Sequence, residues 1–439
     1  MKWSKFVHYF PSFGLLWHAL NMEIIRVAKD LALQFSPDGR VDAASFDRTT
    51  YNHLVAKGFV VRDSHNPEKD LESFVRKENV VQSLYLIVAT SCNLRCAYCL
   101  YNSSQSGSLA ANSGKLMKED VAEQAIRLFA NKTLANNRSS PDYWECITFY
   151  GGEPLLNFDC LQKTVEYVRQ LQGKEKIWKN VRFVVNTNGT LLTKEIASFF
   201  KRENIEVQVS IDGPEEVHDA VRMFHSGKGS FASVISGLEL MRSSGVGFIP
   251  LITVTDTNMD CLTELVVWLC SRFAVGKYGF NLLMHTNGIV DPSYGFRASG
   301  AMRKAHDAAK AFGAVDDCYV GTIRALSSKK VACNSCGVGK KIVVFPEGDM
   351  HVCQALERSG TTSIGKLPEF DPKSPNLLAW SQRDRFSNPT CLACPAIGVC
   401  QGGCGASAYN ATGNICGIDP NYCGWMTAEF RHWISSQSQ

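Results

Sequence analysis

The stretch Ser91-Cys92-Asn93-Leu94-Arg95-Cys96-Ala97-Tyr98-Cys99 decides the fold. Its three cysteines have the spacing C-x3-C-x2-C and follow an apolar, β-branched run, Leu84–Val88, that predicts a strand. Closely spaced thiolates on a loop leaving a strand suit a soft metal or an iron–sulfur cluster. Three ligands on a four-iron cluster leave one iron open to a small molecule. A zinc knuckle or plain buried cysteines are the alternatives, although zinc sites usually use paired C-x2-C units.

This spacing, with the aromatic Tyr98 before the last cysteine, resembles the radical S-adenosylmethionine (SAM) superfamily. The resemblance implies that Cys92, Cys96 and Cys99 hold a [4Fe-4S] cluster whose open iron chelates the amine and carboxylate of SAM. It also implies that an electron cleaves the sulfonium to a 5′-deoxyadenosyl radical.

The composition is that of an ordinary globular chain. It has 439 residues, 45% hydrophobic and 20% charged, enough for two or three domains. A formal charge of +4 gives no argument for nucleic acid or a membrane surface as partner. We find no signal-peptide core and no apolar run long enough to span a bilayer, and we expect a cytoplasmic protein. In a reducing compartment the 17 cysteines favour metal binding over disulfides.

Residues 1–80 form the first predicted unit. Leu15–Leu20 and Glu23–Val27 suit a hairpin, Asp42–Lys57 a helix, and Phe59–Val61 a strand, with a charged linker helix over 66–77. Hairpin, helix and strand resemble a reduced winged-helix module like those that hold leader peptides in ribosomal peptide maturation. A structural cap on the barrel is the equal alternative.

Residues 81–310 alternate between strand and helix patterns, which predicts a parallel sheet with helices outside it. The class is α/β, and six repeats fit the partial (β/α)6 TIM-like barrel of the radical SAM family. The expected helices include Lys118–Ala130, Cys160–Leu171, Lys194–Arg202, Ser230–Ser243 and Asp260–Ser271, and Ala305–Ala311 is helical in composition. The expected strands are Leu84–Val88, Ile147–Tyr150, Arg182–Val185, Val207–Ile211, Phe248–Val254 and Tyr278–Met284.

Polar motifs end three of these strands, where barrels of this kind carry their chemistry. Gly151-Gly152-Glu153 follows the second strand; the glycines allow close backbone approach to a ligand, and by resemblance Glu153 binds the SAM amine. Asn186 ends the third strand, and Ser210 and Asp212 end the fourth, with groups that suit a ribose and the SAM carboxylate. The segment with Arg222 resembles that of sulfatase and peptide maturases, in which the arginine pairs with the SAM carboxylate.

The C-terminal cysteines form a second array, predicted as a domain over 311–439. Cys336-x11-Gly348-x4-Cys353 precedes Cys391-x2-Cys394-x5-Cys400-x3-Cys404, with Cys423 later. This resembles the SPASM domain, which carries two auxiliary [4Fe-4S] clusters in peptide and protein maturases. A single zinc site on 391–404 is the weaker alternative because it leaves Cys353 unexplained.

The family's interleaved wiring assigns the ligands of the two auxiliary clusters. The first would use Cys333, Cys336, Cys353 and Cys404. The second would use Cys391, Cys394, Cys400 and Cys423, with Cys416 as the competitor for the last position. If Cys333 is not a ligand, the first cluster keeps an open iron. The remaining cysteines are interpreted as packing residues: Cys146, Cys160, Cys261, Cys270, Cys318 and Cys416.

The resemblance implies a radical SAM/SPASM oxidoreductase that abstracts a hydrogen from a precursor-peptide side chain and installs a carbon–carbon or thioether cross-link. A reducing partner such as flavodoxin or ferredoxin is implied, and the sequence identifies no general base. Three alternatives stay open. A sulfatase maturase making formylglycine is disfavoured because Gln354 stands where those enzymes place an Asp base. The others are a small-molecule or cofactor biosynthetic enzyme and a non-catalytic electron-transfer protein.

Overall fold

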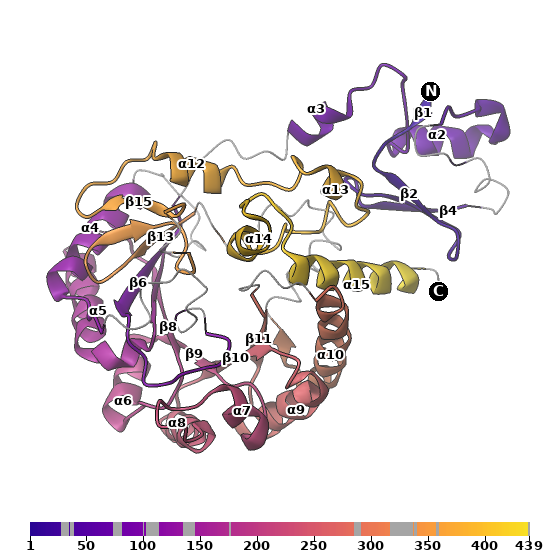
Figure 1. Cartoon of the computed structure of the whole chain (residues 1–439). Coiled ribbons are helices and arrows are strands. Elements are labelled where there is room, and N and C mark those ends of the chain that lie inside the picture. Colours follow the sequence, from indigo (N-terminus) through magenta and orange to yellow (C-terminus); the bar gives the residue numbers. More distant parts are fainter. Residues whose placement is uncertain are drawn as a thin grey trace.

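The computed structural model forms one curved sheet with helices on its outer side and a C-terminal region across its open side (Figure 1). It describes residues 1–27, 35, 39–72, 81–99, 101, 114–134, 145–174, 177–284, 291–316, 337, 340–356 and 360–437. None of the helices in these ranges is long and apolar enough to cross a lipid bilayer.

The central sheet confirms the predicted strand–helix alternation. Its first six strands pair in parallel and lie side by side in sequence order. They are β6 (Ser83–Ala89), β7 (Glu145–Gly151), β8 (Val181–Thr187), β9 (Glu206–Ser210), β10 (Phe248–Val254) and β11 (Lys277–Leu282). The short β12 (Val315–Asp316) continues the sheet beyond β11. The parallel order places the ends of all six predicted strands at one edge.

Each strand alternates between an apolar outer face and a more polar inner face. On β6, the buried Leu84, Leu86 and Val88 belong to the core that the outer helices share. Alternation therefore turns Tyr85 of β6, Tyr150 of β7, Asn186 of β8 and Ser210 of β9 to the inner side. The expected site residues Asn186 and Ser210 accordingly face the concave side of the sheet.

The predicted helices are present, with shifted ends. Thr193 begins α6 with a side-chain cap on Ile196 N, and Asn204 ends it in the left-handed conformation. The expected helix over 305–311 is the end of a longer helix that begins at Tyr294. The sequence pattern showed only its last part, because Gly and Ala at the buried positions give a weak hydrophobic period. The outer helices are α4 (Glu119–Leu134), α5 (Phe158–Gly173), α6 (Lys194–Glu203), α7 (Glu215–Val221), α8 (Phe231–Ser243), α9 (Leu262–Phe273) and α10 (Tyr294–Ala309).

The C-terminal region extends the same sheet. β13 (Lys341–Val344) pairs in parallel with β6, and β14 (Asp349–His351) and β15 (Ser363–Lys366) follow as antiparallel strands. The region then forms α12 (Pro375–Ser381), α13 (Pro389–Leu392), α14 (Gly405–Thr412) and α15 (Pro420–Ser436). α15 packs on α10 so closely that a Cβ on Gly295 would lie 2.4 Å from the carbonyl oxygen of Asn421.

The N-terminal unit confirms the hairpin and adds strands that the sequence pattern did not reveal. β3 (Leu15–His18) and β4 (Glu23–Arg26) pair with β2 (Val7–Phe10) in one antiparallel sheet, and β1 (Lys2–Trp3) pairs with β5 (Val60–Val61). The α3 helix (Pro67–Glu72) covers the described part of the expected linker helix.

The single helix expected over Asp42–Lys57 is wrong. A 3-10 turn at Ala43–Ser45 is followed by α2 (Arg48–Ala56). The break has a local cause, since Phe46 is extended and Asp47 caps a new helix by accepting a hydrogen bond from Thr50 N.

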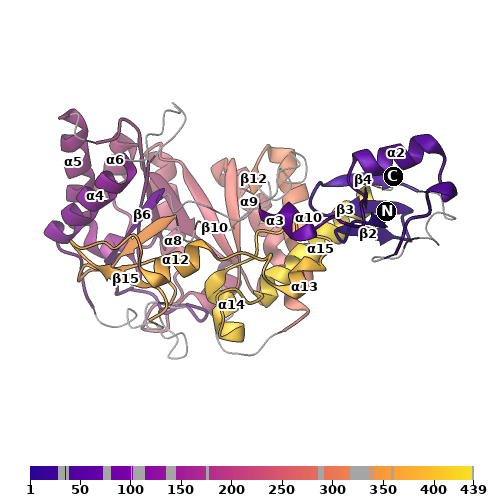
Figure 2. The same ribbon diagram turned by 90° about the horizontal axis from the view of Figure 1, so that it is seen from above.

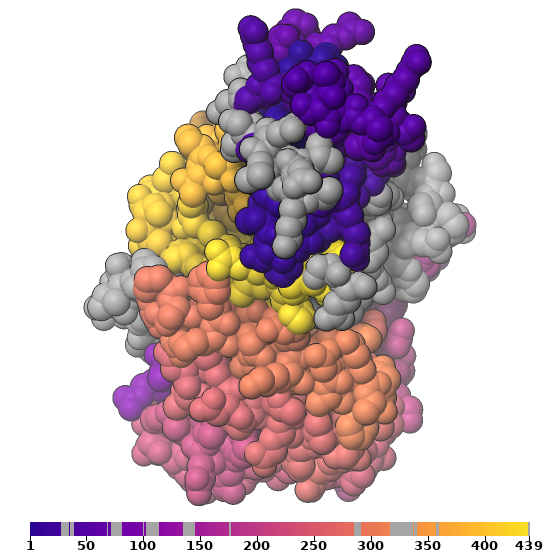
Figure 3. Space-filling model, turned by 90° about the vertical axis from the view of Figure 1, so that its right-hand side faces the viewer, coloured from indigo at the N-terminus to yellow at the C-terminus, as the bar shows by residue number. Residues whose placement is uncertain are grey.

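This N-terminal unit packs against the C-terminal region, as Figures 2 and 3 show. Trp17 is fully buried, donates from its indole nitrogen to Pro395 O at 2.7 Å, and meets the rings of Phe430 and Trp433. A Cβ on Gly398 would lie 2.0 Å from the carbonyl oxygen of Ala19, so the two segments are in direct backbone contact. The N-terminal unit thus supports the loop that carries Cys394.

Candidate functional site

The cysteine loop leaves β6 and is held on both sides by backbone hydrogen bonds. On one side, Gly152 N donates to Ala89 O and Glu153 N to Ser91 O, each at 2.9 Å. On the other side, Arg95 N donates to Met223 O at 2.7 Å and Ala97 N to Val221 O at 2.8 Å. The loop therefore has a fixed path between the end of β7 and the segment after α7.

The two glycines before Glu153 lie in close backbone contact with the chain that leads into the cysteine loop. Gly151 has φ 143°, and a Cβ there would lie 2.1 Å from Ala89 O. A Cβ on Gly152 would lie 2.3 Å from Ser91 O. The glycines therefore let the end of β7 lie directly against Ala89 and Ser91, which lead into the cysteine loop.

Hydrogen-bond donors surround two of the loop sulfurs. Cys92 Sγ is approached by Leu94 N at 3.4 Å and Asn188 Nδ2 at 3.7 Å, and Cys96 Sγ by Arg222 NH1 at 3.8 Å. Burial raises the pKa of the Cys92 thiol to about 12 and also raises that of Cys96. A bound cationic metal group would hold these thiols as thiolates, so the donor set fits an iron–sulfur cluster.

Within the described ranges, no group of three or more Cys, His, Asp and Glu side chains has the geometry to hold a metal ion as it stands. The assignment of the loop therefore rests on its sequence and its donors.

Glu153 is completely buried and joins three elements. Its carboxylate accepts hydrogen bonds from Leu155 N at 3.0 Å, Thr187 Oγ1 at 2.7 Å and Asn188 N at 2.7 Å. Burial raises the pKa of this carboxyl from 4.5 to about 7 despite those donors. An ammonium group nearby would favour the ionised form, which suits the expected role toward the SAM amine.

Asn186 supplies an acceptor with an open position. Its Oδ1 is buried, and among the described residues it has no hydrogen-bond partner. Such a group is costly unless something donates to it. With Ser210 on the same inner side of the sheet, the open acceptor of Asn186 fits the expected contact with a ribose hydroxyl.

Asp212 and Arg222 form an ion pair. The sequence indicated a contact with SAM for each of them and did not predict that they would pair. Arg222 Nε donates to Asp212 Oδ2 at 2.6 Å, and Tyr98 OH donates to the same oxygen. Asp212 is fully buried and its other oxygen accepts from Thr253 N at 2.8 Å. Both oxygens of Asp212 are therefore engaged within the protein.

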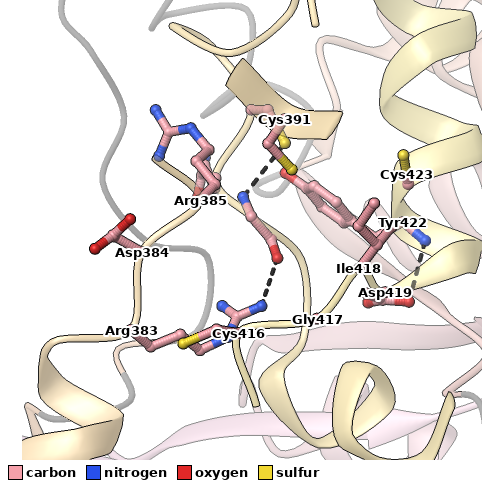
Figure 4. Close-up of a pocket in the computed structure, with 13 residues that line it drawn as sticks. Arg383, Asp384, Arg385, Cys391, Cys416, Gly417, Ile418, Asp419, Tyr422 and Cys423 are labelled. Atoms are coloured by element: carbon pink, nitrogen blue, oxygen red, sulfur yellow. Dashed lines mark hydrogen bonds between the residues drawn. The ribbon is translucent and has the colours of Figure 1, made fainter. Parts of the chain in front are cut away.

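Four C-terminal cysteines gather in the set expected for the second auxiliary cluster. Burial, together with the neighbouring Cys394 and Cys391, raises the pKa of Cys423 to about 11. Burial, with Cys394 and Cys423, likewise raises the pKa of Cys400. A cavity of about 40 Å³ lies here, lined by Cys391, Cys400 and Cys423 (Figure 4). Cys416 also lines it, but in Figure 4 its side chain lies beside Arg383, away from Cys391 and Cys423.

Two buried charged residues shape the loops that carry these cysteines. Arg383 donates to Ile415 O at 2.5 Å, Gly402 O at 2.6 Å and Gly403 O at 3.2 Å. Asp419 accepts from Cys404 N at 2.8 Å while it caps α15, the helix that carries Cys423. The Asp419 carboxylate thus links Cys404, expected in the first auxiliary cluster, to the helix that carries Cys423, expected in the second.

The first expected auxiliary set is described only in part, because Cys333 and Cys336 lie outside the described residues. Cys353 is buried just after β14. Cys404 Sγ lies 3.7 Å from Met284 Sδ, two residues beyond the end of β11. This contact puts Cys404 at the carboxyl ends of the barrel strands, the edge from which the Cys92 loop also leaves.

The residues that sequence reasoning missed act as partners of those it found. Asn188 contacts Cys92, Tyr98 contacts Asp212, and Arg383 and Asp419 hold the C-terminal loops. Asn188 stands in the strand-end run that pointed to Asn186, so that signal was available. Asp419 stands before Pro420 at the start of α15, an N-cap signal that the sequence offered. Arg383 had no comparable signal, since its partners are backbone carbonyl groups.

Of the cysteines interpreted as packing residues, Cys160 and Cys270 are buried in the core, Cys261 donates to Asn258 O, and Cys318 lies outside the described residues. Cys146 instead lies on the inner face of β7, where its sulfur is 3.8 Å from Thr148 Oγ1.

Comparison with known proteins gives a family match to the barrel and matches to individual proteins. The radical SAM superfamily matches residues 86–269. The chain is 22% identical to the radical SAM cyclopropyl synthase TigE of Paramaledivibacter caminithermalis, over 85% of this chain and 79% of that protein. It is 33% identical to the serine-type anaerobic sulfatase-maturating enzyme of Bacteroides thetaiotaomicron, over 39% of each chain, and thus spans well under two thirds of that relative.

Among solved structures, SuiB of Streptococcus suis bound to precursor peptide SuiA has a similar fold. The TM-score is 0.56 at 14% identity, covering 96% of this chain and 100% of that one.

Proposed function

We propose that this chain, which carries a radical SAM domain over residues 86–269, is an enzyme that uses SAM to cross-link side chains of a ribosomally made precursor peptide. The proposed organisation is an N-terminal unit over 1–80, the barrel over 81–310 and a cysteine-rich SPASM-type region over 311–439. The observation that carries the proposal is the arrangement of the C-terminal cysteines at the barrel's open edge, where Cys404 meets Met284.

The proposed roles follow the geometry of the strand ends. Cys92, Cys96 and Cys99 would hold the cluster that binds SAM, and Glu153 would orient its ammonium group. Asn186 and Ser210 would contact its polar groups, and Arg222 would lie near its carboxylate. When bound, the cluster would supply the electron that cleaves SAM. The protein's part is to hold the ligands and to exclude water through the buried Glu153, Asp212 and Arg222.

The C-terminal cysteines would hold two auxiliary clusters. Cross-linking removes two hydrogen atoms, and hence two electrons, from the peptide. The first hydrogen atom would leave with the 5′-deoxyadenosyl group, and clusters at the barrel edge would accept the second electron as its proton is lost. A reduced flavodoxin or ferredoxin would supply the separate electron that is spent on cleaving SAM. That SuiB binds a precursor peptide and that TigE is a cyclopropyl synthase support a peptide substrate here.

Formylglycine formation remains the second candidate because of the similarity to sulfatase-maturating enzymes. Gln354 speaks against it. Its Oε1 accepts from Lys341 Nζ at 3.0 Å, and its carbonyl oxygen accepts from Tyr101 OH at 3.3 Å. An amide cannot take a proton as a general base.

The N-terminal unit would hold the leader of the precursor or would cap the C-terminal region. The contacts of Trp17 with Pro395 and Phe430 support the capping role directly. A leader role would need an additional surface, such as the outer edge of β4.

The test uses anaerobically reconstituted protein with SAM, dithionite and candidate peptides translated from any short reading frames that adjoin its own. We expect 5′-deoxyadenosine, and a peptide lighter by two hydrogen atoms whose fragmentation fails between the joined residues. A product that reacts with a hydroxylamine would instead be an aldehyde and would favour formylglycine. Absence of 5′-deoxyadenosine would favour an electron-transfer protein.

A further inference from the structure

Arg222 is held in one orientation by a buried network. Its Nε donates to Asp212 Oδ2 at 2.6 Å, and its guanidinium lies 5.4 Å from the centre of the Tyr98 ring. Asp212 is fully buried and Arg222 is 8% exposed, so the pair interacts at low dielectric. Such a pair fixes both side chains, because separating them would leave a buried charge alone.

The backbone around this pair is fixed as well. Asp212 O accepts from Asn258 Nδ2 at 2.8 Å. Ser230 Oγ donates to Arg222 O at 2.8 Å, and His218 Nε2 lies 3.0 Å from Ser230 Oγ. Asp212 N lies 3.3 Å from His218 Nδ1, which makes Nδ1 the acceptor and Nε2 the N–H donor. His218 therefore joins the backbones of Asp212 and Arg222 as a neutral ring.

This orientation directs Arg222 NH1 toward Cys96 Sγ, at 3.8 Å. Tyr98, which fixes Asp212 from the other side, lies on the same loop between Cys96 and Cys99. The loop thus carries both a sulfur that Arg222 contacts and a residue that holds the partner of Arg222.

We propose that Arg222, oriented by Asp212 and Tyr98, is a positioning residue that donates to the Cys96 sulfur and raises the reduction potential of the cluster on this loop. The inference rests on the proposed function, since it assumes that Cys92, Cys96 and Cys99 hold a cluster. It assigns Arg222 a task in the SAM-free protein, in addition to the expected contact with the SAM carboxylate. The step is a one-electron reduction in which the electron comes from a reduced flavodoxin or from dithionite.

The physical reason is the extra negative charge of the reduced cluster. A buried guanidinium and an N–H donor at a ligand sulfur stabilise the reduced form more than the oxidised one. Loss of this charge and this donor predicts a lower potential in an Arg222→Gln variant.

The experiment is a potentiometric titration of reconstituted, SAM-free holoprotein, followed by electron paramagnetic resonance. The signal of this cluster is identified in each protein as the one that is lost when Cys92, Cys96 and Cys99 are changed to Ala in that protein; in wild type it is also the one that changes when SAM is added. We expect Arg222→Gln to weaken reduction at least tenfold, which is ~59 mV for a one-electron couple. Arg222→Lys should retain part of the effect, because it keeps the charge and loses the fork of donors.

Arg95→Gln is the matched control, because Arg95 is exposed on the same loop and carries the same charge. It should leave the potential unchanged. Tyr98→Phe gives a second test if Arg222→Gln does not fold; it should lower the potential by less than Arg222→Gln.

An unchanged potential in Arg222→Gln and in Tyr98→Phe would overturn the inference, even if SAM binding were weakened. A fall of the same size in Arg95→Gln would overturn it too, since any nearby charge would then suffice. Failure of the proposed function is distinguishable, because wild-type protein would then show no signal that SAM perturbs.

Discussion

Replacing Glu153 tests whether this carboxylate serves the fold, the ligand or both. Glu153→Ala removes the acceptor of Leu155 N, Thr187 Oγ1 and Asn188 N, all of them buried. A buried donor left without an acceptor costs roughly 2 kcal/mol, so the three unpaired donors cost about 6 kcal/mol. Removing the buried carboxylate, whose pKa is raised to about 7, recovers about 3 kcal/mol at pH 8, so the variant should lose about 3 kcal/mol of unfolding free energy.

Glu153→Gln separates the two roles. Its amide oxygen still accepts the hydrogen bonds from Leu155 N and Thr187 Oγ1. The bond from Asn188 N is lost, which lowers the unfolding free energy by about 2 kcal/mol. Because the carboxyl pKa is raised from 4.5 to about 7, ionising it in the folded state costs about 3 kcal/mol above pH 7, and the neutral amide avoids that cost. The glutamine variant should therefore be about as stable as wild type at pH 8.

Urea unfolding of anaerobic protein, with iron content and SAM affinity measured on the same samples, gives the comparison. We expect Glu153→Ala to lose stability and SAM binding together, and Glu153→Gln to lose at least tenfold in SAM affinity alone. Glu216→Ala, an exposed position in the first turn of α7, is the control. An alanine variant as stable as wild type, or a glutamine variant with full SAM affinity, would refute this reasoning.

Three further predictions concern the C-terminal cysteines and acid stability. Trp17→Ala should cost about 3–5 kcal/mol of unfolding free energy and release iron from the Cys391, Cys394, Cys400 and Cys423 set. Trp3 is also buried but packs within the N-terminal unit, so the Trp3→Ala variant should keep its iron. Equal iron in both variants would contradict the support role of Trp17. Cys423→Ala should lose about four irons and Cys416→Ala none, by colorimetric iron assay, and the reverse result would assign Cys416 as the ligand. Burial lowers the pKa of His218 from 6.5 to about 4. Between these pH values the unfolded chain binds a proton that the folded chain does not. The unfolding free energy should therefore fall by about 3 kcal/mol as the pH is lowered through that window. His218→Gln should reduce that slope in pH-dependent urea unfolding, and an unchanged slope would argue against a buried neutral ring.

Much of the fold could be predicted because strand and helix patterns alternate regularly between residues 81 and 284. The ends of the six barrel strands lie within two residues of the expected ones. The break at Phe46-Asp47 could not be predicted from periodicity, since a cap competes locally with the hydrophobic pattern. The strands β13 to β15 were missed because they extend the barrel sheet from a region that looked separate in sequence.

The candidate site could be predicted by residue type more than by partner. Cysteine spacing pointed to Cys391, Cys394, Cys400 and Cys423 as one set; three of them, Cys391, Cys400 and Cys423, line one cavity, and the set as cluster ligands stays a prediction. The pairing of Asp212 with Arg222 was not foreseen, because it joins residues whose contact depends on how the chain turns after β9. The close approach that requires Gly151 and Gly152 likewise appears only when the cysteine loop is in place.

The central claim is that Cys92, Cys96 and Cys99 hold the cluster at which SAM is cleaved. The most direct measurement compares wild type with the triple alanine variant, reconstituted without oxygen, for iron content and for 5′-deoxyadenosine formed from SAM and dithionite. We predict that iron falls from about twelve to about eight atoms per chain and that 5′-deoxyadenosine disappears. Unchanged iron, or continued SAM cleavage, would contradict the account.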